Sequence, residues 1–186
     1  MTDTIDCFTA FYQEKGEPAV CGIVLCRAEI KRPYFKHRPK GDYLNGLFDL
    51  LIGSIRQLVP LIHADVLHLD VHVHHKNANF KKALDKVRAA AEAARGFEGA
   101  VRRNIIKHTL TRKDHHKPAC YDKMEELTVL LAESNSPAHR ITIATCGDSR
   151  SPDQLAIYAA CQGFWHDMKA KAALMAAVTP EATIAN

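Results

Sequence analysis

The sequence predicts a single α/β domain in which three strands precede an alternation of helices and strands. Two segments near the N-terminus are rich in β-branched, aromatic and cysteine residues and flank a turn sequence at 14–18. Apolar residues then recur at helical spacing between 44 and 59. Farther along, residues 66–73 alternate between apolar and polar side chains, as a strand with one buried face does. The predicted order of elements is βββαβααβα.

The individual elements follow from these periods and from the residues that interrupt them. Residues 5–11 and 19–27 form the predicted hairpin, and a third strand at 30–37 extends it. Asp42 can cap the first helix, which we expect to end at Pro60. The later elements are a strand at 66–73, a helix at 79–95, a helix at 121–133, a strand at 139–146 and a helix starting near Asp153.

Length and composition fit one globular domain. The chain has 186 residues and a net charge of only +4, which is too small to identify a nucleic-acid partner by itself. It has neither an apolar run long enough to cross a membrane nor a secretory signal at its start, so we expect a cytoplasmic location. The six cysteines form no CxxC pair and are interpreted as reduced core thiols. We expect the domain to cover residues 1–178 and residues 179–186 to be a frayed tail.

The segment at 7–10 reads Cys-Phe-Thr-Ala, and the strand predicted at 66–73 contains Leu69-Asp70-Val71. These two sequences resemble the Phe-Thr-Asp start and the fourth strand of ribonuclease H of type 1. The loop at 147–152, Gly-Asp-Ser-Arg-Ser-Pro, is similar to the family's Gly-His-x-Gly-x-Pro. The resemblance extends in pattern over nearly the whole chain. It implies a ribonuclease H-like mixed five-stranded sheet, with its first three strands antiparallel, flanked by helices.

The same resemblance implies that the catalytic site is mostly lost. Ribonuclease H uses four carboxylates to hold two Mg²⁺ ions, a charge density that neutral residues cannot supply. In this chain Asp70 matches one of the four positions, whereas the other three fall on Ala10, Asn45 and Tyr158. The family's loop histidine falls on Asp148, a possible substitute ligand. If any metal ligand of the family remains, it is Asp70. One or two carboxylates bind Mg²⁺ weakly, so we expect an inactive protein.

Two alternatives would restore hydrolysis. A shift of register could bring Asp6 or Asp49 into the site, and Asp49 lies one helical turn after Asn45. A rearranged cluster could instead combine Asp70 with Asp148 and Asp153. Only such an active enzyme would require Mg²⁺ or Mn²⁺, and otherwise no cofactor is expected.

A basic segment is the candidate nucleic-acid interface. Residues 101–117 carry six Lys or Arg against one acid, and some ribonuclease H proteins have a basic protrusion at this point. Such side chains bind phosphates without reading sequence, and their binding depends on salt. The competing interpretation is a solvated helix and loop. The expected contacts are Arg102, Arg103, Lys107, Arg112, Lys113 and Lys117.

Alternating histidines raise the possibility of a metal site. His72 and His74 share one face of the predicted strand, but the sequence places no carboxylate other than Asp70 near them. The simpler interpretation is a set of partly exposed histidines.

The sequence therefore leads to one main functional hypothesis. We expect an inactive ribonuclease H-like domain that binds an RNA–DNA hybrid or duplex. The alternatives are an active metal-dependent nuclease with rearranged carboxylates, and a scaffold subunit that binds another protein.

Overall fold

The structure is a computed structural model that describes residues 2–27, 30–38, 42–64, 68–111, 119–136, 140–147 and 150–178. The predicted tail at 179–186 lies outside these ranges. The elements are β1 (Thr2–Tyr12), β2 (Ala19–Arg27), β3 (Ile30–Arg38), α1 (Tyr43–Ala64), β4 (His68–His74), α2 (Ala78–Ala93), α3 (Gly99–Thr111), α4 (Tyr121–Ser134), β5 (Arg140–Cys146) and α5 (Pro152–Val178).

The strands form one mixed sheet in the order β3-β2-β1-β4-β5. The first three strands are antiparallel, whereas β4 runs parallel to β1 and β5 runs parallel to β4. This is the sheet that the resemblance to ribonuclease H implies, and the predicted fold class is confirmed. From β1 the chain continues to β2 and β3 on one side of the sheet, and β5 is added beside β4 on the other side. The direction of the strand connections therefore changes between β1 and β4.

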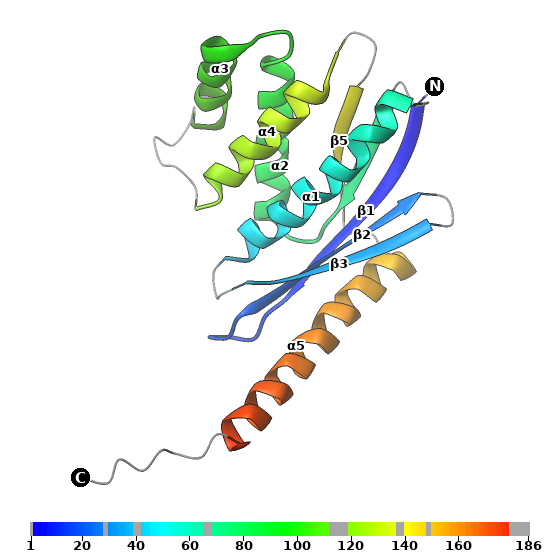
Figure 1. Cartoon of the computed structure of the whole chain (residues 1–186), viewed down its shortest axis with the longest axis vertical. Helices are drawn as coiled ribbons and strands as arrows, with labels where there is room; N and C mark the ends of the chain where they lie inside the picture. Colours follow the sequence, from blue (N-terminus) through cyan, green and yellow to red (C-terminus); the bar gives the residue numbers. More distant parts are fainter. Residues whose placement is uncertain are drawn as a thin grey trace, which may run out of the picture.

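Helices cover both faces of the sheet (Figure 1). Helices α1, α2 and α4 pack on one face, α3 packs on α2 and α4, and all four contribute to the larger apolar core. Helix α5 packs on β1 and β2 from the other face, with Ile157, Cys161 and Trp165 in a smaller core. The outer face of β4 therefore retains partly exposed polar side chains, while Leu69, Val71 and Val73 are buried toward the larger core.

Two glycines allow the helices to approach the sheet closely. A Cβ at Gly22 would lie 2.5 Å from the Sγ atom of Cys161 on α5. A Cβ at Gly46 would lie 2.9 Å from the Sγ atom of Cys21 on β2. Both positions need a residue without a side chain because the neighbouring element occupies that space.

The structure departs from the predicted elements in two places. Helix α3 occupies part of the basic segment, so the order is βββαβαααβα and contains one helix more than expected. Only Ile106 and Leu110 of α3 are buried, which explains its weak apolar period in the sequence. Helix α1 continues through Pro60 to Ala64 instead of ending there. Among the described residues, no helix is both long and apolar enough to cross a membrane.

Candidate functional site

A cleft of about 700 Å³ lies beyond the carboxyl ends of β1 and β4, next to the N-termini of α2 and α5. In open α/β sheets, ligands bind at such ends where the strand connections change direction. We refer to it as the β1–β4 cleft. Its lining residues are Thr9, Ala10, Phe11, Tyr12, Gln13, His75, Lys76, Asn77, Ala78, Arg150, Gln154, Leu155 and Tyr158.

His75, directly after β4, forms part of the cleft's interior. Its ring is buried, and Nδ1 lies 3.0 Å from the carbonyl oxygen of Thr9 and 2.7 Å from Thr9 Oγ1. A carbonyl oxygen can only accept, which assigns the proton to Nδ1. The Thr9 hydroxyl in turn donates to the carbonyl of His74 at 3.0 Å. These bonds fix the His75 ring against the end of β1.

Gln154, in the first turn of α5, also reaches the end of β1. Ser151 and Pro152 are typical of a helix start, and Ser151 Oγ accepts from the backbone N–H of Gln154 at 3.2 Å. The Gln154 side chain is 6% exposed, and its Nε2 donates to the Thr9 carbonyl at 2.9 Å. Its Oε1 has no hydrogen-bond partner within the described part of the chain.

The rim of the cleft is cationic and aromatic. Lys76 and Arg150 are exposed, and neither forms an ion pair with any residue that the structure describes. Asn77 caps α2 by accepting from the N–H groups of residues 79 and 80. Tyr158 of α5 is 47% exposed, and its ring packs edge-on against Tyr12 at a centroid distance of 6.0 Å.

Four positions of this chain correspond to the catalytic carboxylates of ribonuclease H. The structure brings two of these positions together and separates a third from them. Ala10 and Tyr158 both line the β1–β4 cleft. Asp70 lies elsewhere, because its partner on β1 is Thr4, six residues before Ala10. That offset corresponds to about 20 Å along the strand. Asp70 accepts a hydrogen bond from Thr142 Oγ1 on the outer face of the sheet. The resemblance implied that Asp70 and Ala10 share one site, and the register of β1 against β4 contradicts this expectation.

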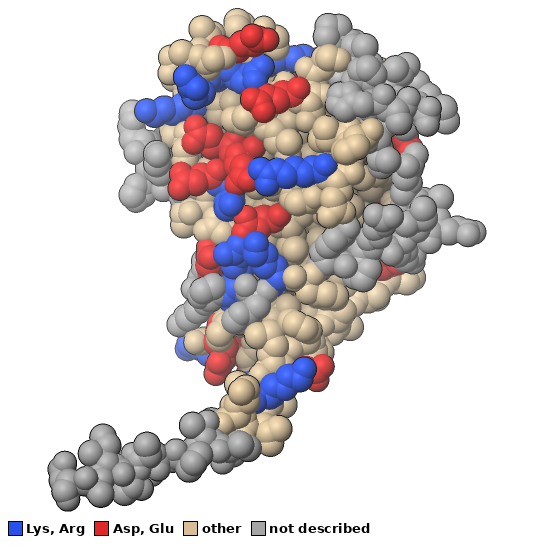
Figure 2. All heavy atoms as spheres, in the orientation of Figure 1, with Lys and Arg blue, Asp and Glu red and all other residues tan. Residues whose placement is uncertain are grey.

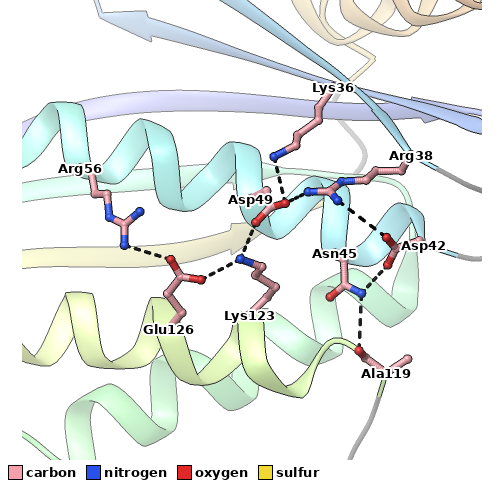
Figure 3. Close-up of polar contacts among 9 residues, drawn as sticks. All are labelled: Lys36, Arg38, Asp42, Asn45, Asp49, Arg56, Ala119, Lys123 and Glu126. Carbon is pink, nitrogen blue, oxygen red and sulfur yellow. Dashed lines mark hydrogen bonds and ion pairs between the residues drawn. The ribbon is translucent and has the colours of Figure 1, made fainter.

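Asn45 and Asp49 lie in the N-terminal part of α1, in a network of hydrogen bonds and ion pairs (Figure 3). Neither lines the cleft. Asn45 donates to Asp42 and lies 3.5 Å from the carbonyl oxygen of Ala119. Asp49 does not join Asp70 in a metal site, since the two carboxylates have entirely different partners.

The Asp49 cluster consists of this carboxylate and three cations. Lys36 and Lys123 lie 3.0 Å and 2.8 Å from its oxygens, and Arg38 forms a third ion pair. The Asp49 side chain is only 11% exposed. Burial, followed by the charges of Arg38 and Lys123, lowers the pKa of Lys36. A carboxylate compensated by three cations is unsuited to binding a further divalent cation.

Lys123 links the Asp49 cluster to Glu126. Its Nζ atom lies 2.9 Å from Glu126, and Arg56 lies 2.9 Å from the other oxygen of the same carboxylate. The hydrogen bond from Lys123 lowers the pKa of Glu126, and the charge of Arg56 adds to this effect.

Asp6 lies on the outer face of the sheet with the alternating histidines. Its Oδ1 is 2.8 Å from His74 Nε2 and 4.0 Å from His72 Nδ1. The sequence did not anticipate this carboxylate beside the two histidines, because the register of β1 against β4 creates the contact. Even so, the described residues contain no group of three or more His, Cys, Asp or Glu arranged to hold a metal ion.

The remaining predicted residues are only partly described. Asp148 lies outside the described ranges, and Asp153 precedes Gln154 on α5 without lining the cleft. On α3, Arg103 and Lys107 are exposed, whereas Arg102 pairs with Glu133 at 3.1 Å. Arg112, Lys113 and Lys117 lie outside the described ranges.

Sequence reasoning missed His75 and Gln154 as site residues. The signal for His75 was its position between a strand and Asn77, a helix-capping residue. The signal for Gln154 was its place in the first turn after Ser151-Pro152. Neither signal indicates that the two side chains converge on Thr9, because that contact joins residues far apart in the sequence.

No protein-family model and no curated protein sequence matches this chain. Solved structures of similar fold include the N-terminal RNase H domain of a Mycobacterium tuberculosis protein, solved as a fusion with maltose-binding protein. It is 11% identical, with a TM-score of 0.43, over 92% of this chain and 99% of that chain. The solution structure of the PFV RNase H domain is 9% identical, with a TM-score of 0.42, over 82% of this chain and 86% of that chain.

Proposed function

We propose that this ribonuclease H-like domain binds nucleic acid without hydrolysing it, and that the β1–β4 cleft is part of the binding surface. The observation that carries the proposal is the charge of the cleft. Lys76 and Arg150 stand exposed at its rim, and no described lining residue has a carboxylate. Cations without carboxylate partners favour an anionic ligand such as a phosphate backbone.

The residues around the cleft also argue against metal-dependent hydrolysis. Holding two Mg²⁺ ions requires several converging carboxylates. At the cleft, Ala10, His75 and Tyr158 instead present a methyl group, an imidazole and a phenol. Of the acids that an active enzyme was expected to use, Asp70, Asp49 and Asp153 do not line the cleft, and Asp148 lies outside the described residues. The proposed binding function therefore includes no resident cofactor.

Helix α3 supplies a second set of cations to the proposal. Arg103 and Lys107 are one helical turn apart and exposed, so they can contact phosphates together. Helix α3 packs on α2 and α4 at the outside of the helical layer (Figure 1). Arg102 contributes less in this proposal because Glu133 already neutralises it.

The proposal is tested by binding of a labelled RNA–DNA hybrid at several salt concentrations, with Mn²⁺ present and the strands examined on a denaturing gel. We expect salt-dependent binding and intact strands. The double variant Lys76→Glu/Arg150→Glu should weaken binding at least tenfold and reduce the salt slope by about two.

The matched control is Lys171→Glu, an exposed lysine of α5 outside the cleft, which should retain most of the affinity. Cleavage of the hybrid would contradict the non-hydrolytic assignment. Absence of salt-dependent binding to hybrid, duplex and single strand would overturn the binding function and favour a protein-binding scaffold.

A further inference from the structure

Gln154, in the wall of the β1–β4 cleft, carries a buried hydrogen-bond acceptor that no described residue uses. Gln154 Nε2 is committed to the Thr9 carbonyl, and because that oxygen can only accept, the orientation of the amide is fixed. Oε1 therefore remains as an acceptor, without a partner among the described residues and on a side chain that is 94% buried. An unpaired buried acceptor is costly, so a ligand with an N–H group would be favoured there.

The wall of the cleft offers an apolar, aromatic surface. Tyr158 and Leu155 lie on α5 beside Gln154, and both are more exposed than large apolar side chains usually are. Tyr12 supports the Tyr158 ring edge-on, which leaves the ring available for stacking. Exposed aromatic rings next to cations are typical of sites that bind single-stranded nucleic acid.

These features together select one ligand chemistry. An unpaired nucleotide combines a planar ring carrying N–H groups with a phosphate, matching the acceptor, the aromatic wall and the cationic rim. In a duplex, the base-pairing N–H groups are occupied and the ring faces are stacked. We propose that the β1–β4 cleft holds one unpaired nucleotide, with its base toward Gln154 and Tyr158 and its phosphate at Lys76 and Arg150. The proposal rests on nucleic-acid binding and adds a preference for single strands.

The experiment compares fluorescence anisotropy of a short labelled DNA single strand, the same sequence as a duplex, and an abasic strand with the same number of phosphates. The full chain should bind the single strand more tightly than either other probe. Tyr158→Ala should weaken single-strand binding about tenfold, the scale of one base–aromatic stack, and should weaken duplex binding much less.

Two controls separate stacking from general surface change. Tyr158→Phe retains the ring and should keep most of the affinity. Phe164→Ala removes another exposed aromatic ring of α5, one that lies outside the cleft, and should leave all three affinities unchanged. The abasic strand should bind Tyr158→Ala and the parent protein equally, because it has no base to stack.

The outcomes distinguish this inference from the proposed function. Equal effects of Tyr158→Ala on all three probes, or no effect on any, would overturn the unpaired-nucleotide site. If Lys76→Glu/Arg150→Glu still weakened binding in that case, the nucleic-acid function would stand. Failure of the parent protein to bind these three probes would overturn the unpaired-nucleotide site, and failure to bind the RNA–DNA hybrid as well would overturn both proposals.

Discussion

The Asp49 cluster and the β1–β4 cleft contain similar cationic side chains in opposite electrostatic situations. In the cluster, three cations surround one largely buried carboxylate. In the cleft, Lys76 and Arg150 are exposed and have no ion-pair partner among the described residues. The ion pairs of the Asp49 cluster hold α1, α4 and β3 together. Cations without a carboxylate partner are available to bind an anionic ligand. The two regions therefore differ in whether their cations form ion pairs, and not in which residue types they contain.

The charged surface illustrates the same difference. Figure 2 shows acidic and basic side chains interspersed over the visible face, with no large area of one sign. Many of these charges form ion pairs, such as Arg56 with Glu126 and Arg102 with Glu133. A net charge of +4 therefore says little about binding, and the cations that pair with no described carboxylate matter more.

The largest expected effect comes from removing the charge of Asp49. Asp49→Asn preserves the shape of the side chain but leaves three cations close together without their carboxylate. We expect the free energy of unfolding to fall by about 2 kcal/mol, less than for a fully buried pair because Lys36 is partly exposed. Urea denaturation measures this change.

The matched control is Asp167→Asn, at an exposed carboxylate of α5, with an expected change within about 0.5 kcal/mol. Equal small effects of both substitutions would mean that the Asp49 cluster does not stabilise the fold.

One buried thiol lies near each of the two regions, and besides burial Cys161 also contributes to the raised pKa of Cys21. Cys21 lies near Arg38 and Asp42, and Cys161 lies against Ala10. Burial raises the pKa of each thiol from 9.0 to about 12. The unfolded chain therefore loses these protons first as the pH rises, and stability decreases between pH 9 and 12. Each thiol should reduce the free energy of unfolding by about 1.4 kcal/mol between pH 8 and 10.

Urea denaturation of the parent, Cys21→Ala and Cys161→Ala at pH 8 and 10 checks this pH dependence. Each variant should lose less stability over this interval than the parent protein, because it lacks one thiol with a raised pKa. An identical loss in all three proteins would show that these thiols do not resist ionisation in the folded state.

The smallest expected effect concerns two neighbouring arginines on α3. Arg102 donates to the Phe97 carbonyl and pairs with Glu133, and its side chain is 18% exposed. Arg102→Ala should therefore lower the free energy of unfolding by about 0.5 kcal/mol. Arg103→Ala should leave stability unchanged and reduce hybrid affinity about twofold to threefold at low salt. The reverse result, with Arg102 controlling affinity, would contradict the distinction between paired and unpaired cations.

Local patterns in the sequence determined most of the elements. The alternation of Leu69, Val71 and Val73 with polar residues marked β4, and all three apolar side chains are buried. The helical spacing of Leu47 and Leu51 marked α1 in the same way. Helix α3 was missed because it buries little apolar surface, and a weak apolar period in a charged segment resembles a solvated loop.

Only the tertiary structure decided which residues meet. The register of β1 against β4 moved Asp70 away from Ala10 and placed His75 beside Thr9. The sequence alone could not fix that register, because sliding one strand by two residues leaves the apolar face unchanged while every polar pairing changes. Likewise, the partners of Asp49 come from distant segments brought together by packing. A periodic pattern determines which face of an element is buried, whereas long-range packing determines which polar groups share a site.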